Sequence, residues 1–143
     1  MIKQKKEYKL PVINGEYFDE YKKRGKPAEL LISELSNYDF TTLKNDKTQI
    51  INNLIAKKTS AYYVNNTVYN CIKIKEYKKA VEWAQILNLY EINNPNYLDT
   101  LGEAYYNADE HLLAQNISDQ LLKLNPKLSN PLKSWEENRK STK

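Results

Sequence analysis

Few side chains in this sequence are of the kinds that carry out chemistry, and they stand apart from one another. His111 is the single histidine and Cys71 the single cysteine of the 143 residues. A nucleophilic cysteine needs a histidine partner, and a catalytic triad or a zinc site needs several such groups together. Cys71 lies at a position that reads as core, and His111 lies at the start of an expected helix, where packing is the simpler role. We therefore expect neither a nucleophile nor a metal site.

Two pairs of adjacent carboxylates, Asp109-Glu110 and Glu136-Glu137, are the other candidates for chemistry. General acid–base catalysis would require a cleft and shifted pKa values around them. A helix N-terminus favours Asp109-Glu110 electrostatically, which is the simpler account of that pair. The sequence also has no glycine-rich loop that could bind phosphate. We expect no enzymatic activity and no cofactor, while an all-α enzyme with an unrecognised site stays open as a weaker alternative.

The composition favours a helical protein. Hydrophobic residues make up 41% of the chain and charged residues 28%, with only three glycines and five prolines. An all-β protein needs many tight turns, which are often glycine-rich, so this scarcity favours helices. The net charge is +4, and the excess lies in the first sixty residues. Since nucleic-acid binding needs a basic stripe and the later residues carry none, we do not expect a nucleic-acid partner.

The sequence contains no predicted membrane-spanning segment and no predicted secretory signal. No stretch approaches the roughly 18 apolar residues of a membrane span, and the N-terminus lacks the apolar region of a secretory signal. The single cysteine permits no internal disulfide and fits a reducing compartment. The simplest expectation is a cytoplasmic protein.

Apolar spacing and capping residues predict the elements that hold these groups. Residues 1–26 form a basic arm with a short helix, and 37–45 form a loop in which Phe40 and Leu43 point inward. Pro27 opens the first helix after the arm, and Asp46 and Ser60 cap later ones. We expect helices over 46–58, 60–74, 76–92, 97–107, 110–124 and 130–140.

One stretch carries a recognisable motif. Residues 95–126 read Pro-Asn-Tyr-Leu-Asp-Thr-Leu-Gly-Glu-Ala-Tyr-Tyr, then Asp-Glu-His-Leu-Leu-Ala, and end in Leu-Leu-Lys-Leu-Asn-Pro. This string resembles a tetratricopeptide repeat, a helix–turn–helix unit of about 34 residues. The resemblance implies structural roles for apolar Leu98 and Leu101, small Gly102 and Ala114, aromatic Tyr105 and the terminal Pro126. Asp109 and Ser118 depart from the pattern, which usually has glycine and an aromatic residue at those places.

A second unit begins at Ala61, where Ala80 and Ala84 match the small positions of the second helix. A third, over 27–60, has lost most of the motif, and residues 129–143 with Leu132 and Trp135 would cap the stack. The resemblance thus implies an all-α fold of antiparallel helix pairs, stacked as a short right-handed solenoid with a C-terminal capping helix. The expected divisions are the arm 1–26, the degenerate helix pair 27–60, two repeats over 61–128, and the cap 129–143.

The resemblance also implies a binding face. In this family the first helix of each pair lines the inner side of the stack, and the corresponding residues here are Tyr62, Asn65, Tyr69, Ile72, Lys73, Asn96, Asp99, Glu103, Tyr106 and Asn107. Amide groups bond peptide backbone, and tyrosine offers a large contact area, so such a face suits a peptide segment. Lys73 alone cannot form the basic clamp with which some members bind a C-terminal carboxylate. The alternative that these are ordinary solvated residues stays open.

We therefore predict a non-enzymatic adapter that binds a protein or peptide partner. The alternative is a helical accessory part of a larger enzyme or assembly, for example one fused to a thioredoxin-like domain. That alternative depends on a loose similarity of the stretches 80–84 and 97–101 to repeat tails of such proteins. The identity of the partner and the oligomeric state are not specified by the sequence.

Overall fold

The computed structural model of the chain describes residues 28–141, and these residues are helical with no strand among them. The all-α class predicted from the sequence is therefore confirmed for this range. The arm predicted over 1–26 and the helix start predicted at Pro27 lie outside the described residues.

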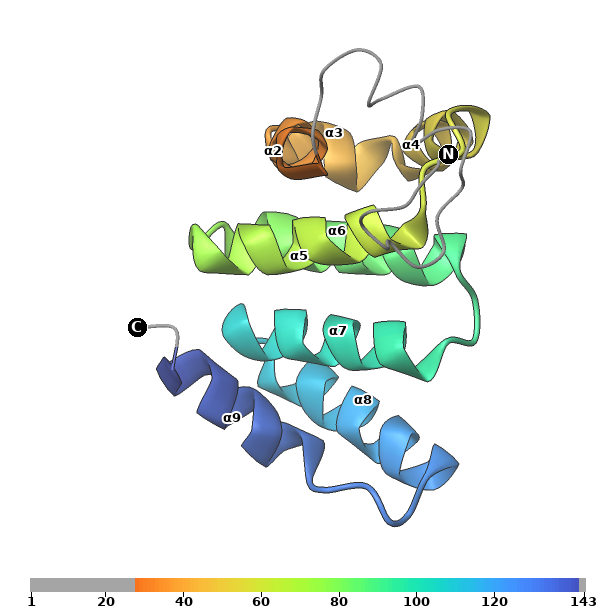
Figure 1. Cartoon of the computed structure of the whole chain (residues 1–143). Helices are drawn as coiled ribbons and strands as arrows, with labels where there is room; N and C mark the ends of the chain where they lie inside the picture. Colours follow the sequence, from red (N-terminus) through yellow and green to blue (C-terminus); the bar gives the residue numbers. More distant parts are fainter. Residues whose placement is uncertain (1–27, 142–143) are drawn as a thin grey trace.

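The helices follow one another through the molecule in the order of the chain (Figure 1). The first three form one end, the α5–α6 hairpin lies beneath them, and the α7–α8 hairpin and α9 follow. Their bounds are α2 Ala28–Ser36, α3 Phe40–Asn45, α4 Lys47–Ala56, α5 Ala61–Lys73, α6 Tyr77–Tyr90, α7 Pro95–Asn107, α8 His111–Leu124 and α9 Pro131–Ser141.

The segment 37–45 was predicted as a loop, and that prediction is wrong, because most of it forms α3. The side chain of Asp39 accepts a hydrogen bond of 3.3 Å from the backbone N–H of Thr42, which caps the helix. Leu43 is fully buried as predicted, and Phe40 is half-buried. Asp46 precedes α4 but makes no side-chain capping bond. Residues 28–56 therefore hold three helices rather than the predicted pair.

Two of the long helices begin with matching caps. Ser60 Oγ accepts from the N–H of Tyr62 at 3.1 Å, and Asn94 Oδ1 accepts from the N–H of Asn96 at 3.0 Å. Each cap satisfies a backbone donor that the first turn of the helix leaves without an intrahelical partner. The predicted cap at Ser60 is thus confirmed, and Asn94 repeats it before α7.

The turns inside the two hairpins also match. Lys75 and Asp109 both adopt a left-handed conformation, with φ of 64° and 63°. The next residue in each case donates its N–H across the helix end, from Glu76 to the Cys71 carbonyl at 2.8 Å and from Glu110 to the Tyr105 carbonyl at 2.9 Å. This bonding is the Schellman type of helix ending, which closes the helix and reverses the chain.

The apolar core continues through all layers. The residues predicted at the close contacts of the repeats are mostly buried: Ala80, Ala84, Ala114 and Gly102 are buried, as is Leu101, while Leu98 and Tyr105 are half-buried and Pro126 is exposed. Trp83 is fully buried on α6 and meets Tyr38 edge-on at 5.4 Å between ring centroids. Its indole N–H has no hydrogen-bond partner within the described part of the chain.

Polar contacts join the first layer to the hairpin beneath it. Lys47 of α4 forms an ion pair with Glu82 of α6. Ser36, at the end of α2, receives a hydrogen bond on its side-chain oxygen from Asn70 and another on its carbonyl oxygen from Lys79. These contacts fix α2 against α5 and α6, although residues 28–56 lack the predicted pairing.

The last helix packs as the sequence predicts. Trp135 is 1% exposed, Pro131 is buried, and α9 contacts both α7 and α8. Most of the other side chains of α9 are exposed. The apolar contacts that hold this helix therefore come from Pro131 and Trp135, with Leu132 packed beside them.

Candidate functional site

The predicted partner-binding residues lie on α5 and α7, and they differ widely in exposure. On α5, Lys73 is exposed, Tyr62, Asn65 and Tyr69 are half-buried, and Ile72 is buried. On α7, Asn96 is exposed, Asp99 and Tyr106 are half-buried, and Glu103 and Asn107 are buried. Each helix thus has one exposed residue of the predicted set, and α7 has more buried ones than α5.

A chain of polar contacts explains why α7 is covered on the side of α5. Tyr69 donates a hydrogen bond of 3.1 Å to Glu103 Oε1, and its hydroxyl lies 3.4 Å from Thr100 Oγ1. Thr100 in turn donates to Asn65 Oδ1 at 2.7 Å. These four side chains bond to one another across the α5–α7 contact, so they hold the two helices in register.

The other side of α7 is covered by α9. Trp135 Nε1 donates to Asp99 Oδ1 at 3.1 Å, and Asn138 Nδ2 donates to Glu103 Oε2 at 3.2 Å. Arg139 bonds Asp109 at 3.3 Å at the end of the hairpin. Asp99 and Glu103, both predicted to bind a partner, are thus already bonded within the chain.

Burial shapes the electrostatics of this cluster. Desolvation raises the pKa of Glu103, and the hydrogen bonds from Asn138 and Tyr69 oppose that rise. Desolvation also raises the pKa of Asp99, against the hydrogen bond from Trp135. The pKa of the Tyr69 phenol is raised chiefly by burial and next by the nearby charge of Glu103. These side chains bond to one another across helix contacts, and Glu103 is 6% exposed, so we assign the cluster a structural role.

An open cavity adjoins the exposed part of the face. It has a volume of about 440 Å³, lies between α2 and α5, and is lined by Glu29, Ile32, Ser33, Asn66, Tyr69, Asn70 and Lys73. Two of these, Tyr69 and Lys73, belong to the predicted set. Glu29 and Lys73 supply opposite charges, and the amides and the serine supply hydrogen-bonding groups.

Sequence reasoning missed the remaining residues of this cavity. Asn66 and Asn70 each follow a predicted position by one residue, which places them on the neighbouring stripe of α5 that faces α2. The repeat pattern did not predict which residues of α2 face α5, because residues 27–60 match the pattern poorly. The helical spacing of Asn66, Tyr69, Asn70 and Lys73 is the signal that could have found the stripe.

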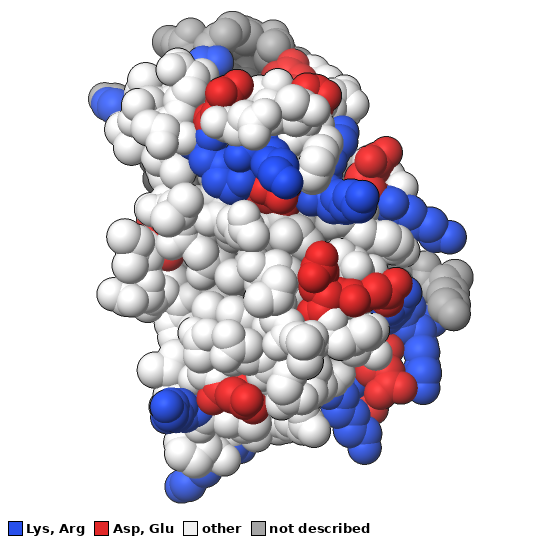
Figure 2. All heavy atoms as spheres, turned by 180° about the vertical axis from the view of Figure 1, so that it is seen from behind, with Lys and Arg blue, Asp and Glu red and all other residues white. Residues whose placement is uncertain are grey.

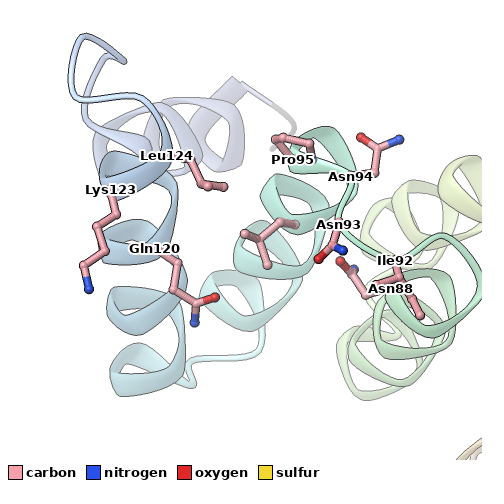
Figure 3. A pocket seen from close by; sticks show the side chains of 9 residues that line it. Asn88, Ile92, Asn93, Asn94, Pro95, Gln120, Lys123 and Leu124 are labelled. Atoms are coloured by element: carbon pink, nitrogen blue, oxygen red, sulfur yellow. The ribbon is translucent and has the colours of Figure 1, made fainter.

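A second hollow lies on another side of the molecule. It has a volume of about 590 Å³ and lies between the end of α6, the start of α7 and the last turns of α8 (Figure 3). Figure 3 shows Gln120 and Leu124 on one side and Asn88 and Asn93 on the other. None of the predicted partner-binding residues lines it.

The groups considered for catalysis are not assembled. Cys71 is fully buried, and burial raises the pKa of its thiol, so it does not present a thiolate. His111 was expected to have a packing role at the start of its helix. It is exposed, its ring lies edge-on to that of Tyr106 at 5.8 Å between centroids, and its Nε2 atom lies 3.7 Å from Asp109. Among residues 28–141 no group of three or more acidic, histidine or cysteine side chains is placed to hold a metal ion.

Two further findings complete the description. In the part of the chain that the structure describes, every helix is too short or too polar to cross a lipid bilayer. The chain matches no protein-family model, no curated protein and no solved structure.

Proposed function

We infer that this chain is a non-catalytic adapter built as a tetratricopeptide-like stack, and that it holds a peptide segment of a partner protein against α5. The cavity between α2 and α5 is the observation that carries this proposal. The stacked architecture and the groups that line the cavity support it in different ways.

Support for the stack comes from the number of residues that separate hydrogen-bonded partners on successive members of the series α2, α5, α7 and α9. The pairs Asn65–Thr100, Tyr69–Glu103, Asp99–Trp135, Glu103–Asn138 and Ser36–Asn70 are separated by 35, 34, 36, 35 and 34 residues. A tetratricopeptide unit has about 34 residues. Successive units stacked in one register would give such recurring separations, because equivalent positions meet at each interface.

Support for peptide binding comes from the lining of the cavity. Asn66 and Asn70 offer amide groups, which both donate and accept hydrogen bonds and so match the backbone of a peptide. Ile32 and the ring of Tyr69 provide apolar contact, while Glu29 and Lys73 would favour a segment with charges of both signs. The lining includes the hydroxyl of Ser33 and the amine of Lys73 but no histidine to activate them, so binding without chemistry is the function that it supports best.

Panning a phage-displayed library of random peptides on the purified protein tests the proposal. Selected peptides are synthesised, and their affinities are measured by fluorescence polarisation for the wild type, Lys73→Ala and Asn66→Ala. We expect each variant to bind about fivefold to tenfold more weakly, which corresponds to the loss of a hydrogen bond or a charge contact.

Matched controls make the result specific to the cavity. Lys133→Ala on α9 and Asn53→Ala on α4 remove the same side chains from exposed positions away from it, and they should leave affinity unchanged. Equal losses in cavity and control variants, or a failure to enrich any peptide, would contradict the proposal.

A further inference from the structure

Helix α8 presents an uncovered stripe on the side opposite the core. Its buried side is formed by Ala114, Ile117, Ser118 and Leu121. At 3.6 residues per turn, the opposite side is formed by Leu112, Asn116, Asp119 and Lys123, and all four are exposed. Leu112 is 87% exposed, an unusual position for a leucine at the first turn of a helix that packs in a stack.

Two exposed leucines lie beside the stripe near the far end of α8, since Leu124 is turned about 100° from Lys123 and Leu128 follows the helix. Leu124 is 64% exposed and Leu128 is 40% exposed, and Leu124 also borders the hollow in Figure 3. Figure 2 shows that the lower half of the molecule, seen from behind, carries large areas without charged side chains. Exposed apolar residues that gather in one region mark an interaction surface more often than isolated ones do.

The charges of the stripe indicate the partner. Apart from His111, Asp119 and Lys123 are the only charged residues in α8. They have opposite signs, lie one turn apart, and form no ion pair with described residues. Asp119 is bonded only by the neutral amide of Gln115, at 2.9 Å. If two α8 helices meet antiparallel about a twofold axis between these residues, each Asp119 lies opposite the other copy's Lys123.

We propose that the Leu112–Lys123 stripe of α8 is a self-association surface and that its occupant is a second copy of this chain. A twofold contact uses the same patch on both copies, so the patch must complement itself, and this stripe does so in charge. The same antiparallel arrangement places Leu112 of each copy just beyond the last turn of the other copy's α8, near the segment that holds Leu128. The contact uses none of the residues that line the α2–α5 cavity, so it is independent of peptide binding.

The dimer is expected to be weak. One helix from each copy buries a small area compared with the roughly 1,600 Å² buried in a stable complex. Association should therefore become visible only at high protein concentration. Sedimentation velocity of the full chain, from about 10 µM to about 500 µM, measures it directly. We expect a concentration-dependent shift from monomer to dimer.

Charge reversal tests the pairing geometry. Asp119→Lys and Lys123→Asp each place like charges opposite one another, and we expect each to weaken dimerisation about tenfold. The double variant restores opposite charges and should dimerise like the wild type. Leu112→Asn should weaken the dimer without changing the circular dichroism spectrum, because the side chain is exposed in the monomer.

A matched control is available on α9. Glu136 and Lys140 form an exposed pair with the same spacing and the same order of signs, and exchanging their charges should leave dimerisation unchanged. The proposal is overturned if the wild type stays monomeric throughout. It is also overturned if Leu112→Asn dimerises as strongly as the wild type, or if the double charge variant fails to recover association.

Discussion

The phenol of Tyr69 on α5 donates a hydrogen bond to the carboxylate of Glu103 on α7, 34 residues later in the chain, and Asn138 of α9 bonds the other oxygen of that carboxylate. One side chain thus receives contacts from the helix before it and the helix after it. Glu103 is 6% exposed, so its ionised form has little water around it. The carboxylate is held in place by hydrogen bonds alone, since no cation is paired with it within the described residues.

Stability should therefore depend on the protonation of Glu103. Burial raises its pKa in the folded chain, so folding favours the protonated form. Ionisation of Glu103 in the folded chain therefore lowers the free energy of unfolding. This loss develops as pH rises from the unfolded-state pKa of about 4.3 through the folded-state pKa, and it is absent at lower pH. Glu103→Gln removes this dependence. Urea unfolding from about pH 4 to about pH 7 should show the wild type losing stability relative to Glu103→Gln as pH rises.

An exposed glutamate provides the control for that experiment. Glu137→Gln on α9 removes a carboxylate that is exposed, and its stability should follow the wild type across the same pH range. Asp99, whose pKa is also raised by burial, remains in both proteins, and, besides burial, its charge is one of the causes that raise the pKa of Glu103. A constant difference between the wild type and Glu103→Gln at every pH would show that the ionisation of Glu103 has no part in folding.

Gly102 is needed because the indole ring of Trp135 lies against its backbone. A Cβ atom at this position would overlap that ring and would lie 2.9 Å from Ile117 Cγ2. Gly102→Ala should therefore displace Trp135 and lower the free energy of unfolding by about 1 to 3 kcal/mol, the usual cost of overpacking. Tryptophan emission should shift to longer wavelength as the ring of Trp135 gains contact with water.

A double-mutant cycle isolates the contact between these two residues. In a Trp135→Ala background the cost of Gly102→Ala should fall, although the contact with Ile117 keeps it above zero. If the cost is the same in both backgrounds, Trp135 is not what excludes a side chain at position 102.

The two helices of the α5–α6 hairpin allow a direct comparison of N-terminal caps. Ser60→Ala removes the side-chain oxygen that accepts the Tyr62 N–H and should cost about 1 kcal/mol in thermal or urea unfolding. Glu76 occupies the same position before α6 but makes no side-chain capping bond, so Glu76→Ala should cost much less. Similar losses for both variants would argue against the capping role of Ser60.

The left-handed residue between α5 and α6 is a site for stabilisation. Lys75 has φ of 64°, which costs a residue with a Cβ atom more than it costs glycine. Lys75→Gly should raise the free energy of unfolding by about 0.5 to 1 kcal/mol, after allowance for the larger entropy of the unfolded chain. Lys78→Gly, in the first turn of α6, should instead lower it, by less than the roughly 1 kcal/mol that glycine costs in a helix interior.

The sequence predicted the later part of the fold well, because local signals there agree with one another. Ser60, Pro95 and the apolar spacing located α5 to α8 to within two residues or so at each end. The prediction failed at α3, where a short helix depends on the cap at Asp39 rather than on a long apolar pattern. Short elements of this kind are specified by one or two hydrogen bonds, which composition does not reveal.

The candidate site was predicted less completely. The repeat pattern located the face of α5, including Tyr69 and Lys73, but it did not show that α9 covers Asp99 and Glu103. Those two bonds depend on Trp135 and Asn138, which lie beyond the unit that the pattern describes. The cavity against α2 was not predicted either, since its position depends on how a helix without the motif packs on α5.

The outer side of α9 is charged. Glu136, Glu137 and Lys140 are exposed there, so this side of α9 offers no apolar surface on which another helix hairpin could pack. Pro131 and Trp135 are buried on the opposite side of the same helix, so α9 is apolar toward α7 and α8 and charged toward solvent. A hairpin designed to pack on its outer side would first require apolar residues at these charged positions.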